Sequence, residues 1–324
     1  MSNTVDGVLV QWGDRLFYPS NRSKVSRTPA LTGLALQERA QALRQRIRAT
    51  VVRRAPQVMV KVTGGGRGMG AMAAHLRYIA KAGRLPIEDD RGIVREGKEA
   101  LRAIADQWRF GGSRIPEVSE RREAFNIMLS MPAGTNPRFV QQAAREFAKA
   151  ELANHRYAMV LHNHQANPHV HITVRAEGRD GRRLNPRKED LRRWRETFAE
   201  RLCSWGIEAE ATSQAIRGSR HREQRTWSRD MRSDSRSASA TMQPPRMSPS
   251  HCRAGEAWVR IAQTLAASPE PSDRELSSAI VRYVREMPVV RGVPARSAQR
   301  DLPGMTRPHT AQMAPTRRDP EIER

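Results

Sequence analysis

The chain has 324 residues with 57 Lys or Arg against 34 Asp or Glu, and its formal charge of +23 at pH 7 favours a polyanionic partner such as nucleic acid. No apolar run approaches the roughly 20 residues of a membrane span, and the first residues lack the pattern of an export signal, which excludes membrane insertion and predicts a cytoplasmic protein. Two cysteines exclude a disulfide framework or a thiolate zinc site, so any metal must be bound by His, Asp or Glu.

Residues 1–54 are predicted to be an N-terminal arm followed by a short basic helix. Residues 1–30 show no sustained hydrophobic period, which favours a mobile arm. From Leu36 to Ile47, apolar residues recur every three or four positions, the spacing of an amphipathic helix.

A domain is predicted over residues 55–217, and its first half begins with a strand. The β-branched segment Gln57–Val62 leads into the glycine run Gly64–Gly66, which predicts a strand followed by a turn. Helices are expected next at Ala71–Ala82 and at Glu99–Trp108.

The second half of this domain also alternates between predicted strands and helices. Strands are predicted at Ala124–Met131, Arg156–His162 and His169–Val174, the last two as a hairpin or a neighbouring antiparallel pair. Helices are predicted after Asn136 and around Leu191–Leu202. The alternation indicates an α+β fold, a sheet with helices on one face.

The C-terminal third is predicted to be largely disordered. Residues 218–254 are a linker and residues 288–324 a basic tail, because Arg, Ser and Pro leave little apolar area to offset chain entropy. Between them, residues 255–287 are predicted to form a small helical hairpin, whose second helix is opened by a capping box of Ser272 and Glu275.

Three histidines have the spacing of a metal site. Residues i and i+2 of a strand face the same side, so His169 and His171 point together. His162 ends the preceding strand, and if the two strands are neighbours the three imidazoles converge on one point. A His-x-His pair alone fits a solvated or hydrogen-bonded pair equally well, and the third histidine favours the metal site.

Cleavage of a phosphodiester needs a nucleophile as well as a metal. Tyr78 is the candidate, because it follows Arg77 and precedes Lys81 on a predicted helix, where basic neighbours favour the phenolate and hold phosphate. The alternative is that Tyr78 packs this helix against the sheet. His164, between the two predicted strands, is a candidate proton carrier or orienting group for a ligand histidine.

Together these segments resemble the conjugative relaxases, or mobilisation nucleases, of the HUH class, in which an apolar residue separates two histidines. The resemblance is most specific at Leu76–Gly83, Leu129–Thr135 and Asn167–His171, and it covers residues 58–217. It implies a five-stranded antiparallel palm with helices packed on the sheet. It also implies a divalent metal, Mg²⁺ or Mn²⁺, held by His162, His169 and His171.

The activity that the resemblance implies is transesterification of single-stranded DNA at an origin of transfer, for conjugation. Tyr78 would end as a 5′-phosphotyrosine and leave a free 3′-OH, and Ser130 would contact the DNA backbone. The implied partners are relaxosome accessory proteins and a type IV coupling protein, through which the protein would pass to the recipient cell with the DNA.

Two positions depart from the relaxase pattern and keep alternatives open. His164 stands where the family usually has an acidic residue, and Asn167 replaces a common histidine. His164 is therefore either a substitute base or a sign of an accessory protein that binds nucleic acid without cleaving it. An HUH initiator of rolling-circle replication would share the site chemistry.

Basic side chains near the tyrosine and after the HUH strand are expected to bind the DNA. Two flank the tyrosine, and four follow the HUH strand closely in sequence and would form a phosphate-binding rim: Arg77, Lys81, Arg182, Arg183, Arg187 and Lys188.

Overall fold

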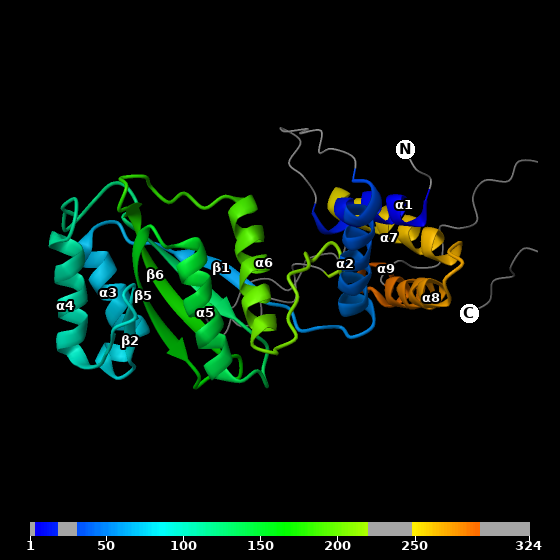
Figure 1. Cartoon of the computed structure of the whole chain (residues 1–324). Helices are drawn as coiled ribbons and strands as arrows, with labels where there is room; N and C mark the ends of the chain where they lie inside the picture. The colour runs from blue at the N-terminus through cyan, green and yellow to red at the C-terminus, as the bar shows by residue number, and fades with distance from the viewer. Residues whose placement is uncertain (1–3, 19–30, 220–247, 292–324) are drawn as a thin grey trace, which may run out of the picture.

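The computed structural model describes residues 4–18, 31–219 and 248–291. They form two regions that lie side by side (Figure 1): a sheet covered by helices α3–α6, here called the palm, and a helical cluster formed by α1, α2, α7, α8 and α9. Within these residues, no helix combines the length and the apolar character needed to cross a membrane.

The palm is built on a six-stranded antiparallel sheet in the order β1-β4-β6-β5-β2-β3. The implied count of five strands is wrong, because a hairpin of two very short strands extends the sheet beyond β5. Strands of two or three residues leave no alternating pattern in the sequence. The strands are β1 (Met59–Gly64), β2 (Ile87–Asp89), β3 (Val94–Arg95), β4 (Ala124–Ser130), β5 (His155–His162) and β6 (His169–Gly178).

Helices cover both faces of the sheet, so the predicted single covered face is wrong. The helices are α3 (Met69–Ile79), α4 (Gly97–Phe110), α5 (Pro137–Glu151) and α6 (Lys188–Ser204). One core joins α5 and α6 to the large side chains of β4 and β6, such as Ile127 and Ile172. The other joins α3 and α4 to smaller residues, Ala124, Ala158 and Val160. These smaller residues let α3 lie close to the sheet.

On the face beneath α3, directly paired residues form rows across β4, β6 and β5. Paired residues of antiparallel strands project from the same face, and alternate residues along each strand return to it. From the start of β6, the rows are Ser130, His169 and His162, then Met128, His171 and Val160, then Asn126, Thr173 and Ala158.

The helical cluster joins the two ends of the chain. It consists of α1 (Val5–Phe17), α2 (Gly33–Val51), α7 (Pro249–Ala266), α8 (Pro271–Glu286) and α9 (Pro288–Arg291). Phe17 packs edge-on against the fully buried Trp258, with 6.1 Å between ring centroids. The predicted mobile arm is therefore wrong for residues 5–17. The apolar face of α1 is stabilised by α7, more than 200 residues away in sequence.

The C-terminal helices also begin earlier than predicted. Helix α7 starts at Pro249, inside the predicted linker, with the Ser248 side chain as its N-cap. Helix α8 is preceded by Glu270 and starts at Pro271, so the predicted capping box at Ser272 is wrong. The predictions for residues 220–247 and 292–324 fall outside the described residues, and the division into five segments stays a prediction.

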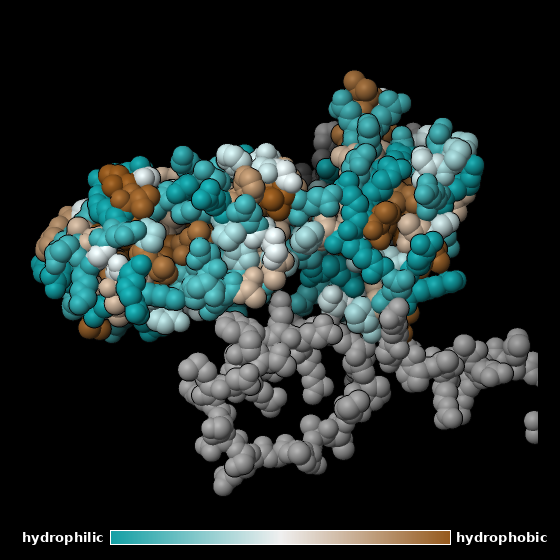
Figure 2. All heavy atoms as spheres, turned by 90° about the horizontal axis from the view of Figure 1, so that it is seen from below, coloured by the Kyte–Doolittle hydropathy of each residue, from teal (hydrophilic) through white to brown (hydrophobic). Residues whose placement is uncertain are grey.

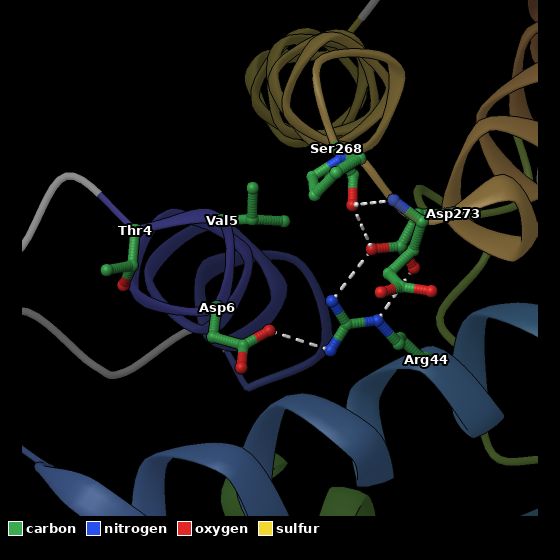
Figure 3. A pocket seen from close by; sticks show the side chains of 8 residues that line it. Thr4, Val5, Asp6, Arg44, Ser268 and Asp273 are labelled. Atoms are coloured by element: carbon green, nitrogen blue, oxygen red, sulfur yellow. Dashed lines mark hydrogen bonds and ion pairs between the residues drawn. The ribbon is translucent and has the colours of Figure 1, made fainter.

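The surface shows no large apolar face in the view from below, where hydrophilic atoms surround separate apolar patches on both regions (Figure 2). A cavity of about 430 Å³ lies in the helical cluster (Figure 3). Arg44 donates to Asp6 at 2.8 Å and to Asp273 at 2.8 and 2.9 Å beside it. The charged groups of this cavity bind one another, which gives it a structural role.

Candidate active site

The three predicted histidines lie at one end of the sheet. His162 and His169 are direct partners in the first row, and His171 lies in the second row on the same face. Their ring centroids are 4.7 to 5.0 Å apart, and one nitrogen from each lies within 4.8 Å of the others. The structure thus brings together a triad that fits one metal ion, while the role of each residue as a ligand stays a prediction.

Backbone carbonyls fix the orientation of two of these rings. His162 Nε2 lies 2.7 Å from the Ile79 carbonyl, and His169 Nδ1 lies 2.9 Å from the Asn167 carbonyl. A carbonyl only accepts, so each of these nitrogens carries the proton and the other nitrogen keeps its lone pair. His171 differs, because its Nδ1 is shielded from solvent and has no hydrogen-bond partner among the described residues.

The triad is electrostatically suited to a cation. Burial lowers the pKa of His171 to about 3, with smaller contributions from His162, His169 and His75. Burial also lowers the pKa of His162, against the hydrogen bond to Ile79. The neutral imidazoles of His162 and His171 present lone pairs, which a divalent transition-metal ion such as Mn²⁺ accepts more readily than Mg²⁺ does. The residues present therefore fit the divalent metal that the family resemblance implies.

Tyr78 stands at the end of α3 that touches the triad. The next residue, Ile79, supplies the carbonyl bonded to His162. The Tyr78 side chain is 75% exposed, so it does not pack the helix against the sheet. Arg77 is also exposed, and Lys81 follows with a positive φ of 48°. The alternative role of Tyr78 as a core residue is therefore wrong.

His164 lies at the rim of the same site. It is exposed, with its ring centroid 5.2 Å from that of His162. Slight desolvation, followed by the charges of Lys81 and His169, lowers the pKa of His164. A neutral imidazole in this position can accept a proton from a group bound at the triad.

Two further groups complete the surroundings. Ser130 shares the first row with His169, and its buried hydroxyl lies 3.3 Å from the Pro168 carbonyl. His75 was not singled out from the sequence, yet its ring lies 6.2 Å from that of Tyr78. The sequence could have indicated His75, because it precedes Tyr78 by three residues on one predicted helix, and this spacing places the two side chains on the same face.

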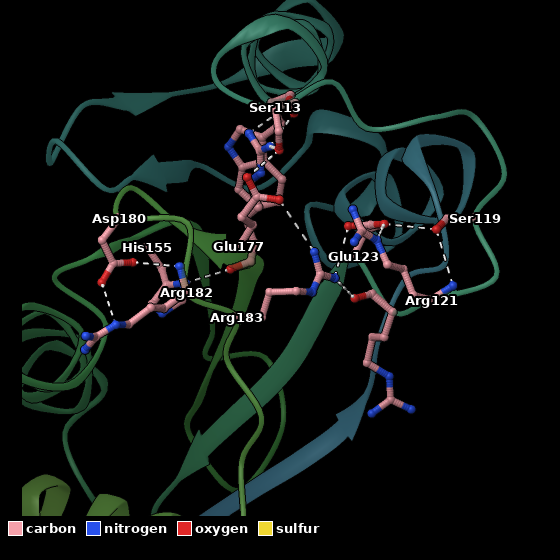
Figure 4. Close-up of polar contacts among 12 residues, drawn as sticks. Ser113, Ser119, Arg121, Glu123, His155, Glu177, Asp180, Arg182 and Arg183 are labelled. Carbon is pink, nitrogen blue, oxygen red and sulfur yellow. Dashed lines mark hydrogen bonds and ion pairs between the residues drawn. The ribbon is translucent and has the colours of Figure 1, made fainter.

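Two residues of the predicted basic rim do not adjoin the triad. Arg182 and Arg183 lie beyond Gly178, at the opposite end of β6 (Figure 4), since the Gly178 amide bonds to the Arg182 carbonyl at 2.7 Å. Ten residues at about 3.3 Å each separate the two ends by roughly 30 Å. Closeness in sequence after the histidines was misleading, because an extended strand carries the chain away.

Of these basic groups, Arg183 has protein partners at the far end. Arg183 bonds to Glu123 at 3.2 Å and to the Arg122 carbonyl at 2.6 Å. The Arg187 amide donates to Asp190 at the start of α6, and Lys188 is the first residue of that helix. A role of these residues in DNA binding stays a prediction.

Comparisons with known proteins confirm the resemblance to relaxases. Residues 87–205 match the family model described as "Relaxase: MobA/VirD2-like, nuclease domain". This range holds the triad, His164 and Ser130, and it begins after Tyr78. The chain is also 25% identical over 183 residues to the T-DNA border endonuclease VirD2 of Rhizobium radiobacter. That similarity covers 50% of this chain and 43% of the relative, so the chain spans less than half of the relative's length.

One solved structure is also similar, from work titled "Molecular Basis of Vancomycin Resistance Transfer in Staphylococcus aureus". It shares 16% identity and a TM-score of 0.30, covering 49% of this chain and 99% of the other. The family model and the endonuclease carry the conclusion without it.

Proposed function

We propose that this chain, which contains a MobA/VirD2-like relaxase nuclease domain, nicks single-stranded DNA at an origin of transfer and stays bound to it through Tyr78. The observation that carries the proposal is the contact between α3 and the triad. The Ile79 carbonyl bonds to His162 at 2.7 Å, and the adjacent Tyr78 phenol is 75% exposed. A nucleophile and a candidate metal site therefore share one end of the sheet.

The proposed reaction conserves the number of phosphoester bonds. The Tyr78 Oη attacks the scissile phosphorus, so an Oη–P bond forms as the P–O3′ bond breaks. The phenolic proton passes to His164 or to water, and the departing oxygen takes up a proton to become a free 3′-OH. A divalent ion bound by His162, His169 and His171 would neutralise charge on the phosphoryl oxygens. Lys81 and Arg77 hold the phosphate beside the phenol.

The biological setting follows the same proposal. The name of the bacterial relative describes an endonuclease that acts at a DNA border, which supports site-specific cleavage here. We place the chain in the cytoplasm of a donor cell, with accessory proteins at the origin and a coupling protein of a type IV secretion channel as partners. Its transfer to the recipient with the DNA completes this proposal.

A second candidate is an accessory protein that binds nucleic acid without cleaving it. The observation that favours it is the composition of the triad's surroundings, where His164 occupies the position of the family's usual carboxylate. A replication initiator of the HUH class is separated from a relaxase by the DNA site it cleaves.

The test is a covalent adduct on a denaturing gel. Purified protein is incubated with labelled single-stranded oligonucleotides that tile the DNA around its gene, with Mn²⁺ or with chelator. We expect a Mn²⁺-dependent adduct that Tyr78→Phe abolishes and the matched Tyr283→Phe, in the helical cluster, retains. Tight binding by the wild-type protein without any adduct, under every divalent ion, would instead establish the accessory protein.

A further inference from the structure

A group of buried polar atoms without partners lies directly behind the triad. Within the described residues, His75 Nε2, Asn126 Oδ1, His171 Nδ1 and Thr173 Oγ1 are shielded from solvent and make no hydrogen bond. Thr173 is fully buried and Asn126 is 8% exposed. An unpaired buried polar group costs about 1 to 3 kcal/mol, so four unpaired atoms in one place point to a missing common partner.

Three of the four lie together on the sheet. Asn126 and Thr173 are direct partners in the third row, and His171 precedes Thr173 by two residues on the same face. Side chains in such positions are about 5 to 7 Å apart, too far for a direct bond between short side chains and suitable for a bridging molecule.

Helix α3 brings the fourth atom over them. The start of α3 lies above the row of Ala124, because Gly66 just before the helix donates its amide to the Ala124 carbonyl, and Met72 shares a buried cluster with Ala124. Its end lies above the first row, because Ile79 bonds to His162. His75 is midway between Met72 and Ile79 along the helix, which places it above the second and third rows.

The chemistry of the four atoms matches a water molecule. The Thr173 hydroxyl and a protonated His171 Nδ1 are donors, whereas Asn126 Oδ1 and an unprotonated His75 Nε2 are acceptors. Two donors and two acceptors fill the hydrogen bonds of one water, and buried waters in polar sites make two to four such bonds. A metal ion fits less well, since the hydroxyl would bind it through an oxygen lone pair and leave the buried hydroxyl proton without an acceptor.

We infer that Asn126 and Thr173 are positioning residues that hold an ordered water, which accepts a hydrogen bond from the Nδ1–H of His171 and leaves its Nε2 free as a ligand. The water would fix which nitrogen of His171 carries the proton, as the Ile79 and Asn167 carbonyls do for His162 and His169. Such outer partners of a ligand histidine change metal affinity by about 10- to 100-fold when they are removed. The inference rests on the proposed metal site.

The test separates the hydroxyl group from the packing of the side chain. Thr173→Val keeps the shape and removes the hydroxyl, and Thr173→Ser restores it. We expect Thr173→Val to weaken Mn²⁺ binding, measured by calorimetry, by about 10-fold or more, with an undiminished unfolding midpoint, and Thr173→Ser to bind like the wild-type protein. The matched Thr63→Val, whose hydroxyl already bonds to the Asn126 carbonyl, should leave Mn²⁺ affinity unchanged.

Two results would overturn the inference without touching the proposed function. One is equal Mn²⁺ affinity of Thr173→Val and the wild-type protein. The other is a high-resolution crystal structure of the wild-type chain without ordered water between these four atoms, which decides the matter even if Thr173→Val does not fold. A wild-type protein that binds no divalent ion would instead refute the proposed metal site. The crystal structure would then still show whether an ordered water lies between the four atoms.

Discussion

The two ends of strand β6 use polar residues in opposite ways. At its C-terminal end, buried charges bond to protein groups: the two terminal nitrogens of Arg175 donate to the Gly111 carbonyl and to the Ser113 hydroxyl, each at 2.8 Å, while its Nε has no partner among the described residues. Glu123 accepts from Arg121 at 2.8 Å and from Ser119 at 2.9 Å (Figure 4). At its start, three imidazoles face one another, and His171 Nδ1 has no partner among the described residues.

The difference separates residues that stabilise the fold from residues that are available to a ligand. A buried charge and its hydrogen-bond partners satisfy one another, and removing the charge leaves those partners without a donor. Neutral groups with unused lone pairs cost free energy when buried and can bind a cation. Substitutions at one end of β6 should therefore leave the properties of the other end unchanged.

The largest effect on stability is expected from Arg175→Met at the paired end. The substitution removes the buried guanidinium and leaves the part-buried carbonyls of Gly111 and Ser113 without this donor. We expect the free energy of unfolding, measured in urea, to fall by about 3 kcal/mol or more. Mn²⁺ affinity of the folded protein should not change. A stability equal to that of the wild-type protein would show that water replaces these bonds.

His171→Asn at the unpaired end should give the reverse result. It removes one of three imidazoles from the triad, so we expect Mn²⁺ affinity to fall by more than about 100-fold, beyond the range of outer partners. Without metal, the free energy of unfolding should stay within about 0.5 kcal/mol. The matched His155→Asn removes a buried histidine bonded to the Arg175 carbonyl, and should lower stability while Mn²⁺ affinity persists.

The sequence predicted the unpaired end better than the paired end. The alternation of side chains along a strand was enough to predict that His169 and His171 face the same side. The predicted neighbouring position of His162 is observed as its direct pairing with His169. The convergence of the triad depends only on local geometry and one strand pairing. The partners of Arg175 come from α4 and the loop after it, more than 60 residues earlier, and no local pattern encodes that contact.

The helix and strands that the sequence did not predict also depend on distant parts of the chain. The helix α1 is stabilised by α7, and the hairpin of β2 and β3 by its pairing with β5, so both depend on distant partners. Arg182 and Arg183 follow the triad closely in sequence, yet they lie a full strand away from it because β6 is extended. Local periodicity thus predicted single elements, whereas the neighbours that complete each site required the tertiary structure.

Acid should lower the stability of the protein in part through His171 at the unpaired end. The pKa of His171 is lowered from 6.5 to about 3 in the folded, metal-free protein. Between these values the unfolded chain binds a proton that the folded protein refuses, so stability falls as pH decreases from about 6.5. The slope is at most about 1.4 kcal/mol per pH unit for this group and smaller with solvent screening. We expect urea unfolding between pH 7.5 and 5 to be less pH-dependent in His171→Asn than in the wild-type protein.

Saturating Mn²⁺ provides the control for this pH dependence. A bound ion competes with protons for the same lone pairs, so it should raise stability at pH 7.5 and make the decline toward pH 5 steeper. If the free energy of unfolding depends on pH equally in the wild-type protein and in His171→Asn, then His171 is not the source of the pH dependence.

The smallest effects are expected from single basic residues in DNA binding. Arg77 precedes Tyr78, whereas the 91% exposed Arg182 side chain lies at the far end of β6, about 30 Å from the triad at about 3.3 Å per strand residue. For an oligonucleotide shorter than β6, Arg77→Ala should reduce the slope of log K against log salt by about 0.7, the loss of one phosphate contact. Arg182→Ala should change neither slope nor affinity. If Arg182→Ala weakens binding only with longer oligonucleotides, the DNA continues along the palm to the far end of β6. If Arg77→Ala and Arg182→Ala weaken binding of the short oligonucleotide equally, the DNA does not enter at Tyr78.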